Sequence, residues 1–183
     1  EEVYRNSGDL TIIGTGSVDE TIFEITNTFM TFTSSSSGTL KNITITGSLP
    51  GNNKAVTTYG SNAILTIDNC KFIDLQGKAI ALLYHGTANI SGSVFSGNSG
   101  PANTSPGGPA ISTEENTTLT LDNCLFYNNQ AVDNNSNHYG AIHLYYQNTY
   151  LTVTNCTFYD NGGEGSVAIY KQESGGNVAV TVS

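Results

Sequence analysis

The sequence has few cationic residues. It contains six Lys and Arg against fifteen Asp and Glu, which gives its 183 residues a formal net charge of -9. Phosphate binding needs clustered cations that displace counterions, and anionic lipid surfaces attract the same residue types. We therefore expect no nucleic-acid partner and no docking on an anionic membrane.

Long hydrophobic runs are also missing. None approaches the ~20 consecutive apolar residues of a membrane-spanning helix. The chain starts at Glu1 with neither a Met nor a signal-like apolar segment. We expect no membrane insertion in this segment, and we interpret the chain as a monomeric segment of a longer protein.

Cysteine is scarce, and no two cysteines form a C-x-x-C pair. Cys70, Cys124 and Cys156 are the only three, so a zinc knuckle or a redox motif is not indicated. All three occupy one position of the repeat described next, and stacked side chains that point the same way make poor disulfide geometry. We predict a ladder of small, buried, unreactive thiols.

What the sequence does contain is a repeat. The segment LTLDNCLFYNN at 119–129 returns as LTVTNCTFYDN at 151–161, as LTIDNCKFIDL at 65–75 and more loosely as ANISGSVFSGN at 88–98. A period of about 20 to 50 residues is typical of solenoids and propellers. The unequal spacing of the copies indicates a solenoid with loops of variable length on its rim.

Each repeat unit contains three short segments of alternating apolar residues and no helical period. In one unit the inward positions are Leu119, Leu121, Cys124, Phe126, Ile142 and Leu144. Such segments, with Asn and Gly at the corners, indicate strands joined by tight bends. We predict an all-β parallel β-helix, a solenoid with three short strands per turn and about six turns.

Equivalent residues of successive turns should stack about 4.8 Å apart. The expected interior column of aromatic rings is Phe72, Phe95, Phe126 and Phe158, and the expected corner column is Asn42, Asn69, Asn123 and Asn155. Residues 1–38 lack this unit, and terminal repeats of solenoids are often atypical. We therefore predict an N-terminal cap or degenerate first turns over 1–38 and β-helix repeats over 39–183, within a single domain.

Two short motifs carry a resemblance to known proteins. FSGN at 95–98, FYNN at 126–129 and FYDN at 158–161 follow an F-x-x-N pattern, and GPAI at 108–111 and YGAI at 139–142 approximate G-G-A-I. From about Thr39 to the end, the chain resembles the right-handed parallel β-helix repeats of polymorphic outer-membrane autotransporter adhesins. It is also similar to the adhesin-like surface proteins of methanogenic archaea. The resemblance implies a right-handed helix, an extracellular, cell-surface location and a role in attachment, and it supplies no catalytic residue.

An enzyme on the same fold is the alternative, because β-helices also host polysaccharide lyases and glycoside hydrolases. Hydrolysis needs two carboxylates about 5 to 10 Å apart. Asp68 and Asp122 share a column two turns apart, and Glu114 is a third candidate, although Asp beside a corner Asn also serves the bend. A lyase would need a basic residue beside acidic ones, but Arg5 lies outside the repeat and we expect the five lysines to share no column. We therefore predict no catalytic residue.

The outer face of the strand that begins with Ala-Ile is where we expect binding. Its first outward column reads Thr57, Ala81, Ser112, His143 and Tyr170, and its second reads Tyr59, Leu83, Glu114, Tyr145 and Gln172. Exposed aromatics beside polar groups suit a sugar ring, although Tyr also has a high strand propensity. We predict His143, Tyr145, Tyr170 and Glu114 as binding residues for a glycan or protein on another cell.

Loops 97–108 and 131–139 would add specificity to this face. Oxygen-rich loops at 133–137 and 160–164 lack the spacing of an EF-hand. We predict neither a metal site nor a cofactor.

Overall fold

The computed structural model describes residues 3–100, 107–131, 140–162, 168–172 and 178–183. Within these ranges the chain forms strands, turns and bends. No helix in this part of the chain is long and apolar enough to cross a membrane.

One wall of the molecule is a six-stranded parallel sheet in the order β16-β13-β10-β7-β4-β2. We call it the Phe wall. Its strands are β2 (Ile22–Ile25), β4 (Thr44–Ser48), β7 (Lys71–Gln76), β10 (Val94–Ser96), β13 (Leu125–Tyr127) and β16 (Thr157–Tyr159). Consecutive strands of this sheet come from consecutive turns of the chain.

The other two walls are the arms of one twelve-stranded sheet that bends through β3 (Met30–Lys41). The Ile wall comprises β5 (Lys54–Tyr59), β8 (Lys78–Leu83), β11 (Ile111–Thr113), β14 (Ile142–Leu144) and β17 (Ile169–Lys171). The Thr wall comprises β6 (Ile64–Asp68), β9 (Thr87–Ser91), β12 (Thr118–Asp122), β15 (Thr149–Thr154) and β18 (Val178–Val182). The first half of β3 pairs with β5 and the second half pairs with β6.

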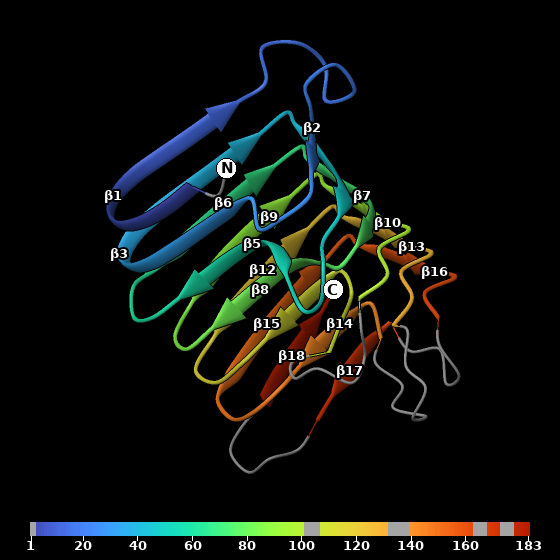
Figure 1. The fold of residues 1–183 in the computed structure, drawn as a ribbon. Coiled ribbons are helices and arrows are strands. Elements are labelled where there is room, and N and C mark those ends of the chain that lie inside the picture. Colours follow the sequence, from blue (N-terminus) through green and yellow to red (C-terminus); the bar gives the residue numbers. More distant parts are fainter. Residues whose placement is uncertain (1–2, 101–106, 132–139, 163–167, 173–177) are drawn as a thin grey trace.

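These walls confirm the predicted parallel β-helix with three strands per turn (Figure 1). Each turn after the first visits the Phe wall, the Ile wall and the Thr wall in that order, as β4, β5 and β6 do. In the part of the chain assigned to a cap or degenerate turns, β1 (Val3–Ile13) pairs in parallel with β3, and β2 pairs in parallel with β4.

The predicted column of aromatic rings fills the interior beside the Phe wall. Phe72, Phe95 and Phe126 are fully buried. Their ring centroids lie 5.0 Å and 4.8 Å apart, and Phe158 continues the stack at 4.7 Å, with neighbouring rings within 5° of parallel. Because the strands pair in register, identical residues face identical residues, and the prediction of an interior Phe column is confirmed.

The Asn of the F-x-x-N motif also lies inside, a position that the repeat pattern did not predict. Asn98 and Asn129 are fully buried and Asn161 is nearly so. Each side-chain amide donates to the side-chain oxygen of the next Asn at 2.8 Å, from Asn98 to Asn129 and from Asn129 to Asn161. The same amides donate to backbone carbonyls of the Phe column, so these buried polar groups are satisfied.

The corner Asn column has a backbone reason. Asn42, Asn69, Asn123 and Asn155 all adopt the left-handed region, with φ between 50° and 53°. Asn tolerates this conformation better than most residues. Asn69 also donates its amide to the side-chain oxygen of Asn42 at 2.9 Å, as expected for a shared corner ladder.

The cysteine ladder is only partly as predicted. Cys70 and Cys124 are buried, whereas Cys156 is half-buried, and all three are free thiols. Burial raises the pKa of Cys70, and it raises the pKa of Cys124 to about 12. The expectation of a fully buried ladder is therefore wrong at Cys156, which lies on the outermost coil of the Phe wall.

Candidate functional site

The strand register of the Ile wall agrees with the two outward columns expected from the sequence. Ala81 pairs with Thr57 on one side and Ser112 on the other, and Ser112 pairs with His143, which pairs with Tyr170. The second column follows from the same register, because Tyr59 pairs with Leu83. The structure thus aligns the predicted binding residues along neighbouring strands.

The expectation that His143 is exposed is wrong. Its side chain is only 1% exposed, and its Nδ1 accepts a hydrogen bond from the backbone N–H of Gly107 at 2.7 Å. A Cβ on Gly108 would lie 2.6 Å from the backbone nitrogen of His143, so only glycine allows this approach. Residues 107–108 therefore cover the outer face of β14, and the small side chains of Ala81 and Ser112 beside it are also buried.

Burial changes the chemistry of His143. Burial and, to a smaller extent, the nearby charge of Lys78 together lower the pKa of His143 to about 3. The imidazole is neutral at pH 7, which suits an Nδ1 that accepts a backbone hydrogen bond. His143 thus positions the covering segment and neighbouring rings and does not present an open surface.

Two lysines extend the buried part of this face. Lys78 is fully buried, and burial lowers its pKa to about 7. Lys54 is half-buried and pairs with Lys78 in the β5–β8 register. The expectation that the lysines share no column is therefore wrong at this pair, and the sequence held the signal, since each Lys directly precedes the recurring pair Ala-Val or Ala-Ile.

Accessible aromatics gather where the strands of the Ile wall end. We call the group Tyr59, Tyr84, Glu114, Tyr145 and Tyr146 the tyrosine surface. Tyr59, Tyr84 and Tyr146 are 49%, 39% and 38% exposed. The rings of Tyr59 and Tyr84 meet edge to face at 5.3 Å, and those of Tyr145 and Tyr146 lie 3.9 Å apart. Such rings present apolar faces and hydroxyl groups together.

Glu114 lies among these rings. Burial raises the pKa of Glu114, and the approach of the Tyr84 hydroxyl and the charge of Lys54 offset this only in part. In turn, the charge of Glu114 raises the pKa of Tyr84. Its Oε2 atom is buried and has no hydrogen-bond partner among the described residues. Such an atom is costly unless something satisfies it.

The backbone is strained at the same place. Tyr84 and Tyr146 have φ values of 44° and 65°, in the left-handed region that bulky residues rarely enter. Strain of this kind costs about 1 to 3 kcal/mol per residue and clusters at ligand sites. Tyr84 and Tyr146 were not predicted, because no strand pattern shows which residue after a strand turns left-handed.

The structure brings the predicted binding residues into one neighbourhood. The ring of His143 lies 5.4 Å from that of Tyr145 and 5.2 Å from that of Tyr170. Glu114 occupies the position before Tyr145 in the outward column. Tyr145, Tyr170 and Glu114 are half-buried. Residues 101–106 and 132–139 of the loops predicted to add specificity lie outside the described residues.

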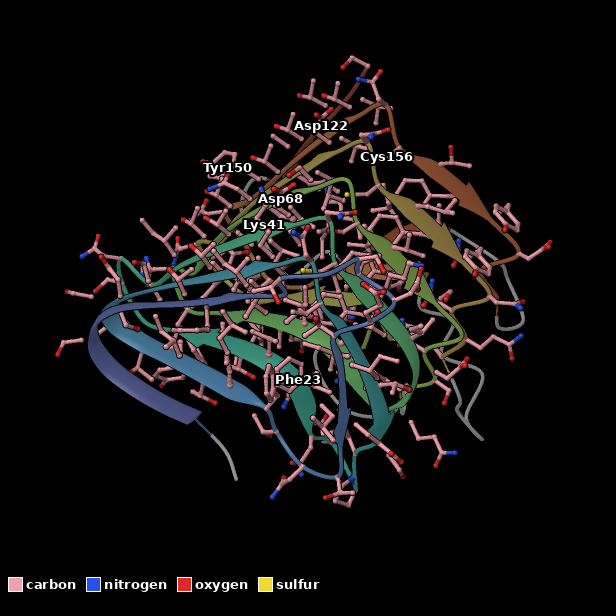
Figure 2. All side chains as sticks on the ribbon, turned by 90° about the horizontal axis from the view of Figure 1, so that it is seen from above. Phe23, Lys41, Asp68, Asp122, Tyr150 and Cys156 are labelled. Carbon is pink, nitrogen blue, oxygen red and sulfur yellow. The ribbon has the colours of Figure 1, made fainter. Side chains whose placement is uncertain are left out.

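The carboxylates proposed for hydrolysis lie on a different wall from Glu114. Asp68 and Asp122 flank Ser91 in the register of the Thr wall, as expected from the repeat (Figure 2). Lys41 contacts Asp68 at 2.6 Å, and this hydrogen bond lowers the pKa of Asp68. An ionised Asp68 lacks the raised pKa of a general acid. The structure therefore does not combine Asp68 or Asp122 with Glu114.

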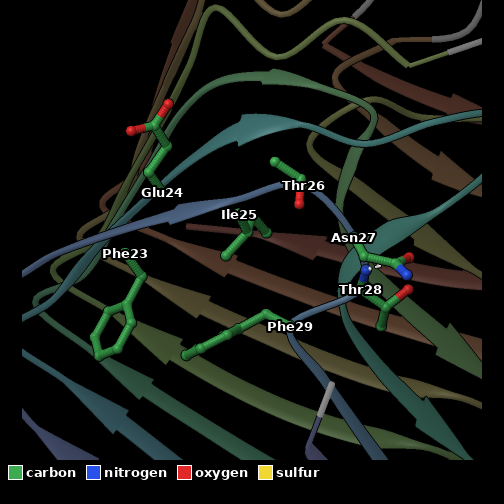
Figure 3. Close-up of a pocket in the computed structure, with 7 residues that line it drawn as sticks. All are labelled: Phe23, Glu24, Ile25, Thr26, Asn27, Thr28 and Phe29. Atoms are coloured by element: carbon green, nitrogen blue, oxygen red, sulfur yellow. Dashed lines mark hydrogen bonds between the residues drawn. The ribbon is translucent and has the colours of Figure 1, made fainter. Parts of the chain in front are cut away.

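Two pockets lie near the ends of the solenoid. One, of about 510 Å³, is lined by residues 23–29, with the rings of Phe23 and Phe29 centred 5.0 Å apart (Figure 3). Phe23, Ile25 and Phe29 lie on one side of this segment and Glu24 on the other. The second, of about 540 Å³, includes Asn128, Phe158 and Ala168. Neither pocket contains a residue of the tyrosine surface.

The described residues contain no group of three His, Cys, Asp or Glu side chains that could hold a metal ion. The absence of a metal site stays a prediction.

Comparison with known families agrees with this architecture. Residues 29–181 match a family described as the right-handed β-helix region. The chain belongs to this family. Comparison of the chain with curated proteins and with solved structures found no match. Membership in the right-handed β-helix family establishes the fold, whereas function depends on the sites that a chain builds on that fold.

Proposed function

We propose that this β-helix is a non-enzymatic recognition segment of an extracellular, cell-surface, adhesin-like protein. It attaches to a glycan or protein on another cell through the tyrosine surface. The observation that supports this most is the coincidence of two strained tyrosines, Tyr84 and Tyr146, with a buried carboxylate oxygen of Glu114 that has no partner among the described residues.

The scaffold favours recognition for a physical reason. The tyrosine surface sits at the ends of strands that are locked by in-register pairing, so its rings lose little freedom on binding. Tyr offers a large contact area and a hydroxyl while losing only two rotatable angles. Tyr145 directly follows β14 and contacts the buried ring of His143. Tyr170 borders the same surface through its own contact with His143.

The test uses substitutions that remove a ring and relieve strain together. Tyr84→Gly and Tyr146→Gly should leave the protein at least as stable, because glycine accepts a positive φ. Adhesion of the purified segment to target cells should nevertheless fall at least tenfold. Tyr150→Ala is the matched control, since Tyr150 is 49% exposed on the Thr wall. Unchanged adhesion in both glycine variants would remove the tyrosine surface as the recognition site.

A carbohydrate-active enzyme, a polysaccharide lyase or glycoside hydrolase, is the second candidate. The raised pKa of Glu114 favours it, since a general acid needs such a shift. A polysaccharide panel assayed for reducing ends and unsaturated products separates the two functions. Turnover that disappears in Glu114→Gln would establish the enzyme and overturn the purely adhesive role.

A further inference from the structure

We infer that the tyrosine surface takes a neutral, linear, β-linked oligosaccharide that lies along the solenoid axis with one sugar per coil. This inference rests on the proposed recognition function and names its ligand class.

The geometry of the strip matches an extended sugar chain. Tyr59, Tyr84, Glu114 and Tyr145 follow one another on four successive coils, at or just after the ends of β5, β8, β11 and β14. Paired strands lie about 4.8 Å apart, so the strip is roughly 14 Å long. One coil is close to the length of one hexose in an extended β-linked chain. Successive sugars can therefore meet successive coils, with the contact at Tyr84 offset by one residue because Tyr59 pairs with Leu83.

The chemistry of the strip fits a sugar with free hydroxyl groups. The exposed rings of Tyr59 and Tyr84 offer apolar faces to pyranose rings. Between them and Tyr145 lies the half-buried carboxylate of Glu114, which can accept a hydrogen bond from a hydroxyl group of the ligand. A partly desolvated acceptor that gains a partner on binding contributes specificity, because a ligand without the donor leaves it unsatisfied.

Charge selects against acidic sugars. Glu114 and its neighbour Glu115 lie near the middle of the strip in a chain of net charge -9. The lysines that act on Glu114 are Lys54, which is half-buried, and Lys78, which is fully buried. Burial keeps Lys78 from pairing with a uronate carboxylate, and the charge of Lys54 already interacts with that of Glu114. A uronic acid would meet like charge at the centre of the strip.

The size of the strip favours a glycan over a protein. A stable protein interface buries about 800 Å² on each partner and involves about 20 to 30 residues a side. The tyrosine surface is a narrow line of five side chains. A linear chain fills such a line, whereas a folded protein would need contacts well beyond it.

The experiment is calorimetric titration of the purified chain with three ligand series. They are neutral β-linked oligosaccharides from disaccharide to hexasaccharide, their α-linked isomers, and oligouronates of equal length. Affinity for the β-linked series should rise with each added sugar up to about four, one for each coil of the strip, and then level off. It should exceed affinity for the uronates and the α-linked isomers at least tenfold.

Glu114→Gln tests the central contact. The variant should bind the neutral series several-fold more weakly. The ratio of its affinities for neutral and acidic oligosaccharides should also fall, an effect that a merely structural role of Glu114 would not produce. Glu24→Gln is the control, because Glu24 is exposed on the Phe wall. Equal binding of uronates, no dependence on chain length or an unchanged gap in Glu114→Gln would each overturn the inference.

The outcome also separates this inference from the proposed function. Adhesion that is lost in Tyr84→Gly while no oligosaccharide binds would overturn the glycan inference and leave recognition standing. Adhesion that survives in Tyr84→Gly and Tyr146→Gly would remove both.

Discussion

The interior of the Phe wall and the outer face of the Ile wall are built by the same in-register stacking. The first repeats the same residue from coil to coil, whereas the second changes its residue from coil to coil. Inside the Phe wall, Phe95 meets Phe126 and Asn98 meets Asn129. Outside the Ile wall, each coil contributes a different residue, so that Ser112 meets His143 and His143 meets Tyr170. Repetition marks the part of the molecule that holds it together.

The two regions also differ in whether their buried polar groups have hydrogen-bond partners. The buried amides of the Asn ladder have partners in the neighbouring coils. On the tyrosine surface, Glu114 keeps a buried oxygen without a partner among the described residues, and Tyr84 holds a left-handed backbone. The Phe wall thus satisfies its own buried polar groups, and the contrast supports our proposal that the end of the Ile wall is a recognition surface.

The largest effect should come from breaking the aromatic column. Phe126→Ala removes a fully buried ring stacked between two others, and it should lower the free energy of unfolding by about 3 to 5 kcal/mol. Urea denaturation measures this change. Thr152→Ala, at an exposed position of the Thr wall, should change it by less than about 0.5 kcal/mol. Equal effects of the two variants would contradict the assignment of the ring column to the core.

The burial of His143 on the outer face of the Ile wall should make the stability of the chain depend on pH. The pKa of His143 is lowered to about 3 in the folded chain, against about 6.5 in the unfolded chain. The unfolded state therefore binds the proton more readily, and stability is lost as pH falls below about 6.5, by up to about 1.4 kcal/mol per pH unit.

His143→Gln isolates this contribution, because Gln keeps a hydrogen-bond acceptor and cannot titrate in this range. Between pH 7 and pH 4, the free energy of unfolding from denaturation curves should fall more steeply with decreasing pH for the natural chain than for the variant. Parallel pH profiles would mean that His143 is not buried as a neutral imidazole.

Breaking the Asn ladder should cost less than breaking the Phe column. Asn129→Leu removes the acceptor of Asn98 and the donor to Asn161, which should destabilise the chain by about 1 to 3 kcal/mol. We expect a moderate loss because the chain already places a Leu at the equivalent position of another coil. Leu75 lies three residues after Phe72, as Asn129 does after Phe126, and it is fully buried beside Asn98. Thermal unfolding of Asn129→Leu beside Asn89→Ala, an exposed Asn on the Thr wall, measures the difference. A variant as stable as its control would show that the ladder is dispensable.

The smallest effect concerns the thiols, and it leaves the fold intact. Burial raises the pKa of Cys124 to about 12, whereas Cys156 is half-buried. Alkylation at pH 8 under native conditions, followed by mass spectrometry, should modify Cys156 at least about tenfold faster than Cys124. Cys70 should behave like Cys124, since burial also raises its pKa. Equal rates for all three in the native chain would contradict the burial of the inner two.

Much of the fold could be predicted because a solenoid makes the same side-chain contacts on each successive coil. Every copy of N-C-x-F meets its copy on the next coil, so aligning the sequence with itself also aligned the strands in space. The same alignment gave the outward columns of the Ile wall, including Tyr145 beyond the end of β14. It failed where a residue meets a segment that does not repeat, as His143 meets Gly107.

The sequence by itself determined the coil, the register and the interior Phe column, because these depend on spacing alone, whereas the burial of Asn98, Asn129 and Asn161 appeared only in the structure. Only the tertiary structure decided which outward residues are open to solvent. Glycines at 107–108 let the backbone cover His143, whereas the left-handed turns at Tyr84 and Tyr146 hold their rings in the open. Those outcomes depend on close packing between segments and on single backbone angles, and neither leaves a period in the sequence.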